Sequence, residues 1–274
     1  ELKIDGKING AVGNYNAHVL AFPEAPWQKM SKQFVHHLGL NWNPITTQIE
    51  NHDSVVDFCY LIARLAGIAI DISKDCWGYI SFGYFKQKLK KDEVGSSTMP
   101  HKVNPIDFEN AEGNFGISVS LAHHFGSKLP ISRFQRDLSD STTLRALSEM
   151  FGHFFLGLKS LEKGLKKLTP STDIILEDLS NSWEILGEAV QTLLRKNGVA
   201  DAYEQIKNLT RGQSLDKKQY LNLVQNLKQL SRDDQNKLLQ LRPETYLGLA
   251  ELGSGAMGIR LCSPNGLGGR RHGH

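Results

Sequence analysis

A proline-free stretch from residue 54 to residue 90 constrains the fold of this chain most. Apolar residues recur there three or four positions apart, and Asp53 can cap the start, so the pattern predicts one long helix. At 1.5 Å per residue, this helix would be roughly 55 Å long. Its middle, residues 61–72, is apolar on more than one face, which indicates neighbouring helices around it. We therefore expect a bundle of long helices that forms an oligomer.

The rest of the chain also shows helical patterns, and no strand alternation or hairpin pair stands out. The predicted fold class is therefore all-α. We predict a central long-helix bundle domain at 1–168, with its amino-terminal part missing, and a smaller helical domain at 169–251. The glycine-rich tail at 252–274 is interpreted as vector-derived or disordered. Besides the long helix, helices are predicted at 106–127, 141–168, 173–197, 202–209, 216–230 and 233–241.

Composition bears on partners and compartment. The net charge of +3 is accounted for by the tail, which holds three arginines and no acid, so the body of the chain is neutral. A neutral body gives no reason to expect nucleic-acid or membrane binding. The three cysteines, Cys59, Cys76 and Cys262, are an odd number without CxxC spacing, which favours a reducing, cytoplasmic location. No apolar run approaches the ~20 residues of a membrane helix.

The loop at 95–105 has the sequence GSSTMPHKVNP. Asn104 can cap the predicted helix that follows, and Pro105 suits its first position. The positive end of the helix dipole then faces a loop with hydroxyls and an ammonium group, an arrangement that attracts anions. Any helix-to-helix connection has a similar composition, but Met99, an apolar residue among ionisable ones, favours a functional loop.

A second candidate site follows the predicted helix at 106–127. Arginines and hydroxyl residues lie close together there, a combination that suits phosphate oxygens. The alternative is that the charged residues of this segment form ion pairs with one another. The charged residues are Arg133, Arg136, Asp137, Asp140 and Arg145, and the hydroxyl residues are Ser139, Ser141, Thr142 and Thr143.

The loop at 95–105 resembles the signature of the fumarase/aspartase superfamily, helical enzymes that eliminate fumarate from succinyl compounds. Further segments at 7–14, 46–50, 106–110 and 133–145 are similar to the bacterial type of the adenylosuccinate lyase family. The resemblance covers residues 3–250. It implies a lyase of purine nucleotide biosynthesis that cleaves adenylosuccinate to AMP and fumarate. It also implies the same cleavage of the succinylated aminoimidazole carboxamide ribotide, without cofactor or metal.

The resemblance also implies roles for individual residues. Ser96 would be the general base, and Lys102 would stabilise its alkoxide, because the elimination builds up negative charge beside a carboxylate. The family forms homotetramers with active sites shared between subunits. The implied substrate-binding residues are Gln48, Ser97, Met99, Asn104, Asn110, Arg136, Ser141, Thr142, Thr143 and Arg145.

One departure from the family pattern stands out. The chain lacks the amino-terminal domain, including the histidine segment that the family uses as general acid, so we expect this carboxy-terminal fragment to be inactive alone. His101 is interpreted as an ordinary loop residue. Two alternatives stay open: another fumarate-releasing lyase, such as argininosuccinate lyase, fumarase or aspartase, or a non-catalytic helical oligomerisation scaffold.

Overall fold

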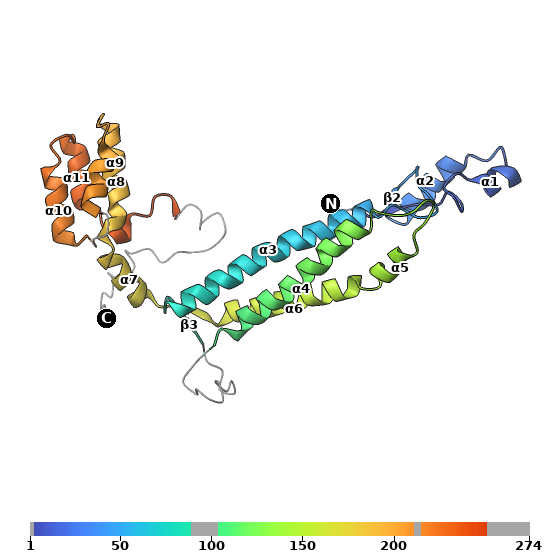
Figure 1. Ribbon diagram of the computed structural model, residues 1–274, viewed down its shortest axis with the longest axis horizontal. Coiled ribbons are helices and arrows are strands. Elements are labelled where there is room, and N and C mark those ends of the chain that lie inside the picture. The colour runs from blue at the N-terminus through green and yellow to red at the C-terminus, as the bar shows by residue number, and fades with distance from the viewer. Residues whose placement is uncertain (1–2, 89–103, 211–214, 251–274) are drawn as a thin grey trace, which may run out of the picture. The chain divides into compact units, whose positions relative to one another are not determined.

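The computed structural model describes residues 3–88, 104–210 and 215–250. The chain divides into two compact units, residues 1–170 and 171–274. The described residues are mainly helical, so the predicted all-α fold class is confirmed (Figure 1). The division follows Pro170, whereas the sequence analysis placed the domain boundary after residue 168. The predicted tail at 252–274 lies outside the described residues.

The core of the first unit is a bundle of three long helices, α3 (Asp53–Ser81), α4 (Ile106–Lys128) and α6 (Leu147–Lys167). Helix α4 packs along both α3 and α6 (Figure 1). Its apolar side chains are removed from water on both sides, and this burial is the main stabilising contribution to the bundle. The fully buried apolar side chains of the bundle include Cys59, Phe108, Phe115, Phe125 and Met150.

Glycines let aromatic rings lie directly on helix backbones in this bundle. A Cβ atom at Gly157 of α6 would lie 2.8 Å from the ring of Phe115 on α4. A Cβ atom at Gly164 would likewise lie 2.8 Å from the ring of Phe108. Both distances are shorter than carbon atoms tolerate, so α4 and α6 approach each other closely only because these positions lack side chains.

Helix α4 begins at Ile106 as predicted and ends at Lys128, one residue beyond the predicted end. The prediction for the first long helix is wrong at its carboxyl end. Helix α3 stops at Ser81, because Gly83 takes a positive φ of 78° and turns the chain. Strand β3 (Phe85–Gln87) then pairs antiparallel with β4 (Leu168–Pro170). The start also differs, since His52 and not Asp53 is the capping residue.

The predicted helix at 141–168 is two helices, α5 (Ser139–Leu144) and α6, so this prediction is wrong. The hydroxyl-rich sequence of α5 explains the break. Thr143 donates a hydrogen bond from its side chain to the Ser139 carbonyl (3.1 Å), and such bonds compete with the helical backbone pattern.

The segment before α3 contains elements that the sequence analysis did not predict. Strands β1 (Asp5–Gly6) and β2 (Asn41–Trp42) pair in parallel, and helices α1 (Asn16–Ala21) and α2 (Trp27–His37) lie between them in the sequence. The loop at 43–52 then leads into α3.

The second unit is a small helical domain with its own core. Tyr220 lies at its centre and donates its hydroxyl proton to the Leu238 carbonyl (3.0 Å). The predicted helix at 173–197 is divided at Ser182, and the other predicted helices are found within a few residues. The elements are α7 (Thr172–Asn181), η1 (Trp183–Leu186), α8 (Gly187–Lys196), α9 (Ala202–Thr210), α10 (Lys217–Asn226), α11 (Arg232–Gln240) and η2 (Pro243–Thr245).

In neither unit is any helix among the described residues long and apolar enough to cross a membrane.

Candidate functional site

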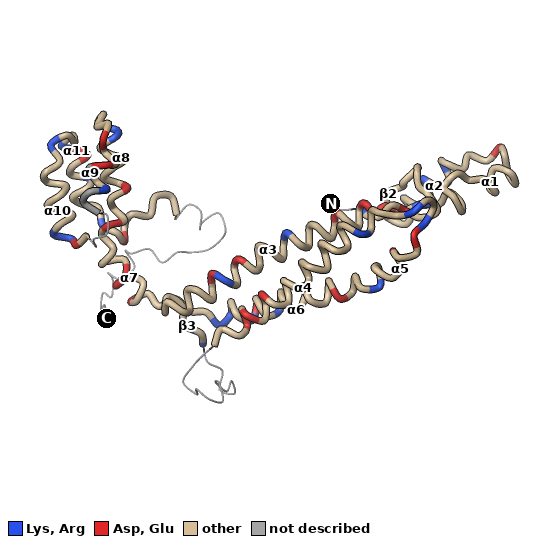
Figure 2. The backbone as a smooth tube through the Cα atoms, viewed as in Figure 1, with Lys and Arg blue, Asp and Glu red and all other residues tan. Residues whose placement is uncertain are grey.

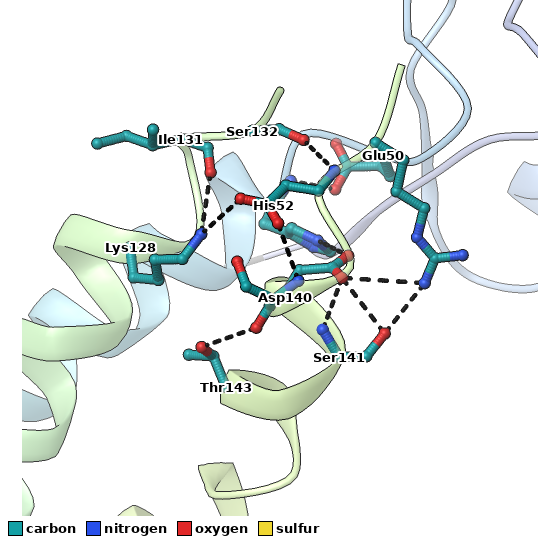
Figure 3. Close-up of polar contacts among 11 residues, drawn as sticks. Glu50, His52, Lys128, Ile131, Ser132, Asp140, Ser141 and Thr143 are labelled. Atoms are coloured by element: carbon teal, nitrogen blue, oxygen red, sulfur yellow. Dashed lines mark hydrogen bonds and ion pairs between the residues drawn. The ribbon is translucent and has the colours of Figure 1, made fainter. Parts of the chain in front are cut away.

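Two segments that are distant in the sequence meet beside the amino-terminal end of α3. One is the loop at 43–52, and the other is the connection at 129–145 that includes α5 (Figure 3). The imidazole Nε2 of His52 lies 3.6 Å from Oδ2 of Asp140, which joins the two segments. The candidate phosphate-binding residues predicted from sequence therefore lie beside the loop that carries Gln48.

The centre of this region consists of Arg136, Asp140 and Ser141, which we call the Arg136–Ser141 site. Arg136 donates a hydrogen bond from Nη2 to the Ser141 hydroxyl (3.0 Å), and the same nitrogen lies 3.9 Å from Asp140 Oδ1. The Ser141 backbone N–H donates to that carboxylate oxygen at 2.6 Å. Asp140 is buried, whereas Arg136 is exposed and Ser141 half-buried. A guanidinium and a hydroxyl are thus held side by side at the surface, a combination that suits phosphate.

A neighbouring carboxylate, that of Asp137, neutralises two nearby cations. Asp137 pairs through Oδ2 with Arg133 (3.3 Å) and Lys128 (3.7 Å), and its Oδ1 accepts a hydrogen bond from the Ser139 backbone N–H (3.0 Å). Hydrogen bonds from Ser139 are the main reason that the pKa of Asp137 lies below its ordinary value, and the two cations add to the effect. Arg133 therefore supports the connection, and Arg136 is the arginine that pairs with a hydroxyl.

The remaining predicted phosphate ligands have different surroundings. The Thr143 hydroxyl is engaged by the Ser139 carbonyl, while Thr142 and Arg145 are exposed. Arg145 follows Ser141 by four residues in continuous helical backbone, so it lies on the same side of α5. The structure thus favours Arg145 over Thr143 as an additional ligand.

Gln48 lies in a loop that a half-buried lysine holds in place. Lys7 donates from its ammonium group to the carbonyls of Gly10 (3.2 Å), Thr47 (2.9 Å) and Gln48 (2.8 Å). Burial lowers the pKa of Lys7. With its own carbonyl fixed and its side chain exposed, Gln48 is available to a ligand.

The structure does not bring all predicted site residues together within one chain. Asn110 lies in the second turn of α4 and donates a hydrogen bond to the Ser160 hydroxyl (2.6 Å). Lys128 follows Asn110 by 18 positions in the helix, so Asn110 is roughly 27 Å from the other end of α4 along the helix axis. Asn104 lies just before the start of α4, at the same end of the helix as Asn110. It is exposed, and the predicted cap is wrong, since Pro105 is the capping residue and no side-chain hydrogen bond is made there.

The predicted catalytic residues Ser96 and Lys102, and the predicted ligands Ser97 and Met99, lie outside the described residues. What the structure describes is the helix start that follows them.

Asp107, in the first turn of α4, pairs with Lys163 (2.8 Å) and Lys167 (2.7 Å) of α6. The side chains of Asp107 and Lys167 are 7% and 8% exposed, so this is a buried ion pair. Burial by itself raises the pKa of Asp107, but the hydrogen bonds and charges of the two lysines outweigh it, and the pKa lies below its ordinary value. The sequence analysis missed this cluster, because sequence spacing does not reveal contacts between separate helices.

His52 was also missed, because nothing in its sequence surroundings distinguishes it from an ordinary surface histidine. Among the described residues, no group of three or more His, Cys, Asp or Glu side chains is arranged to hold a metal ion.

Comparisons with known proteins first define the class. A family model described as "Lyase" matches residues 3–117, and one described as "Adenylosuccinate lyase C-terminal" matches residues 132–247. Among solved structures, a fumarate lyase from Mesorhizobium sp. BNC1 is similar, with a TM-score of 0.67 and 18% identity over 94% of this chain and 57% of that one. A 3-carboxy-cis,cis-muconate lactonizing enzyme from Pseudomonas putida has a TM-score of 0.63 and 18% identity over 92% and 56%. These two show the fold alone.

Comparison with curated relatives identifies the family more specifically. An adenylosuccinate lyase from Legionella pneumophila (strain Corby) is 52% identical over 252 residues, which are 91% of this chain and 55% of the relative. One from Buchnera aphidicola subsp. Baizongia pistaciae is 50% identical over 249 residues, 91% of this chain and 54% of the relative. One from Escherichia coli (strain K12) is 47% identical, covering 91% and 55%. The chain belongs to the adenylosuccinate lyase family, and it spans about half the length of the curated relatives it matches.

Proposed function

We propose that the full-length protein cleaves adenylosuccinate to AMP and fumarate, and the succinylated aminoimidazole carboxamide ribotide to the corresponding amide and fumarate. The pairing of Arg136 with Ser141 (3.0 Å) is the observation that carries the proposal, because both substrates are nucleotides with a terminal phosphate. A guanidinium beside a hydroxyl can donate several hydrogen bonds to phosphate oxygens. Arg145 lies on the same segment as this pair, and Gln48 lies on the loop at 43–52 that meets this segment through His52 and Asp140.

The chemistry of the proposal is a β-elimination. A base removes the proton from the succinyl carbon next to a carboxylate, the C–N bond breaks, and the nitrogen of the leaving nucleotide takes up a proton from an acid. Ser96 is proposed as the base and Lys102 as the cation that stabilises its alkoxide and the developing dianion. Neither a cofactor nor a metal ion takes part. The general acid would come from a histidine segment that the family carries.

Several copies of the chain would have to build one active site. Asn104 and Asn110 are at the opposite end of α4 from the Arg136–Ser141 site, and a nucleotide is shorter than the roughly 27 Å between them. A homotetramer with shared active sites brings opposite ends of different bundles together. We propose this assembly in the cytoplasm.

Exposed apolar side chains on the bundle support an assembly of this kind. Large apolar patches on a protein surface commonly mark interfaces. Charges of both signs are distributed along the three helices, with uncharged stretches between them (Figure 2). The exposed large apolar residues are Tyr60, Leu61, Leu65, Ile68, Ile72, Trp77 and Tyr79 of α3, Ile106 and Ile117 of α4, and Phe155, Leu156, Leu158 and Leu165 of α6. If they form the interface, Ile68→Glu in the full-length protein will lower the molar mass measured by light scattering.

The substrate assignment is tested with the full-length protein by calorimetric titration of AMP and an absorbance assay of fumarate release. Arg136→Ala is expected to weaken AMP binding by about tenfold or more, since a hydrogen bond to a charged group contributes roughly 1.5–3 kcal/mol. Arg133→Ala is the matched control, because Arg133 is exposed and already paired with Asp137. Equal affinities of the two variants for AMP would contradict the phosphate assignment. That outcome would favour a lyase whose substrate has no phosphate, such as argininosuccinate lyase, fumarase or aspartase.

A further inference from the structure

Asp140 is shared between the two segments of the site through its two carboxylate oxygens (Figure 3). Its Oδ1 accepts hydrogen bonds from the backbone N–H and the hydroxyl of Ser141, at 2.6 and 3.3 Å, and lies 3.9 Å from Arg136. Its Oδ2 lies 3.6 Å from Nε2 of His52. One oxygen therefore orients the proposed phosphate ligands, and the other faces the loop at 43–52.

His52 is held in an unusual position to face this oxygen. Its backbone adopts a positive φ of 66°, which is unfavourable for a residue with a side chain and persists only where the surroundings fix it. The surroundings do so here: the His52 N–H donates to Glu50 Oε2 (2.7 Å), and its carbonyl accepts from Val56 in the first turn of α3 (2.9 Å). The buried Nε2 atom has no hydrogen-bond partner among the described residues.

Binding of a phosphate would change the interactions of the Asp140 carboxylate. The phosphate would engage Arg136 and the Ser141 hydroxyl, so Asp140 would lose part of their support and gain a negative neighbour. A buried carboxylate in that position is costly unless another donor satisfies it. The His52 nitrogen is already aimed at the free side of this carboxylate, and a movement of about 0.5 Å would bring the pair within hydrogen-bond distance.

We propose that His52 is a positioning residue for the phosphate site. Its Nε2–H donates to Asp140 Oδ2 and so fixes the carboxylate that orients Ser141 and Arg136 toward the ligand. The inference rests on the proposed function, because it assumes that Arg136 and Ser141 bind a phosphate. It adds a residue that makes no contact with the ligand, and it ties the Gln48 loop to the phosphate site.

The test compares two substitutions of His52 in the full-length protein. Asparagine tolerates a positive φ but is too short to reach Asp140, whereas the glutamine amide can occupy the place of Nε2. Dissociation constants for AMP and for adenosine are measured by calorimetry, together with kcat and KM for adenylosuccinate. We expect His52→Asn to weaken AMP binding about tenfold, the low end for a charge-assisted hydrogen bond, and adenosine binding less than about twofold. KM should rise with little change in kcat, and His52→Gln should restore most of the AMP affinity.

Other results would overturn the inference. Unchanged AMP affinity in His52→Asn would do so, and so would an equal loss for AMP and adenosine, which would mean that His52 only maintains the loop. A glutamine variant no better than the asparagine variant would exclude the donor role.

A second perturbation keeps the inference testable if His52→Asn does not fold, as judged by circular dichroism. Asp140→Asn removes the charge that His52 supports and should produce the same AMP-selective loss; an equal loss of adenosine affinity would contradict the inference. Arg136→Ala distinguishes a failure of the proposed phosphate site from a failure of the proposed role of His52. If it leaves AMP binding intact, the proposed phosphate site itself fails; if it abolishes binding while both His52 variants bind normally, only the role of His52 fails.

Discussion

Replacing Asp107 by asparagine should destabilise the bundle more than any exposed charge substitution on it. Asparagine has nearly the same shape as aspartate but carries no charge, so the change removes the Asp107 counter-charge from the buried Lys167 ammonium. The other partner, Lys163, is half exposed and can turn toward water. The expected loss of stability therefore comes mainly from the effect on the buried Lys167 ammonium.

The magnitude follows from the burial of the pair. Removing one partner of a buried ion pair costs about 3–5 kcal/mol, because the remaining charge is uncompensated. Since the Lys167 side chain retains 8% exposure, we expect about 3 kcal/mol for Asp107→Asn. Glu112→Gln is the matched control on the same helix. Its partner Lys74 is 3.3 Å away, but the two side chains are 44% and 62% exposed, so the expected loss is below about 1 kcal/mol.

Urea unfolding of the full-length protein at one fixed protein concentration would measure both losses, because the stability of an oligomer depends on concentration. The double variant Asp107→Asn with Lys167→Met should recover much of the loss, since it also removes the buried cation. A loss for Asp107→Asn no greater than that for Glu112→Gln would refute the reasoning.

The same ion pair predicts a pH dependence. The pKa of Asp107 is lower in the folded protein than its ordinary value of 3.8, so folding favours the charged form. The contribution of the pair is therefore fully present above the unfolded pKa and is lost as the pH falls through the folded pKa. The difference in stability between the native protein and Asp107→Asn should disappear at the acidic end of a pH series.

Three further substitutions in the full-length protein have defined outcomes. Ser96→Ala should lower kcat by several orders of magnitude while AMP still binds, and near-normal turnover in the fumarate assay would contradict its role as base. Gly13→Ala should abolish the fold of the segment before α3, because Gly13 has a φ of 81° and its Cβ would clash with the Thr46 carbonyl oxygen; a normal near-ultraviolet dichroism spectrum would count against this. Gly157→Ala should cost about 1–3 kcal/mol by overpacking against Phe115, and an unchanged urea midpoint would show that the ring can move aside.

The sequence was most informative where one physical signal dominated. Helix α4 was predicted almost to the residue, because Pro105 and the acidic residues Asp107 and Glu109 define its start and its apolar positions continue without interruption. The carboxyl end of α3 was misplaced because helical spacing extends past Gly83, whereas the turn at Gly83 ends the helix and leads into the pairing of β3 with β4. That pairing joins residues about eighty positions apart, which no local pattern reveals.

The residues of the candidate site also differ in how far the sequence alone could indicate them. Composition indicated only the cluster of arginines and hydroxyl residues at 133–145, and the resemblance to the family selected Arg136 and Ser141 within it. The structure adds a physical reason to prefer them over Arg133 and Thr143, since Asp137 and the Ser139 carbonyl already engage those two side chains. The roles of His52 and Lys7 depend on contacts with distant segments and have no signal in the sequence.

The aromatic rings seated on Gly157 and Gly164 restrict how α4 can move. Sliding α4 along α6, or rotating it, would drive each ring from a side-chain-free position into a neighbouring side chain. The helix therefore behaves as a rigid rod that keeps its two ends at a constant spacing. Sliding of α4 against α6 is therefore a costly way for a ligand at one end of the bundle to affect the other end.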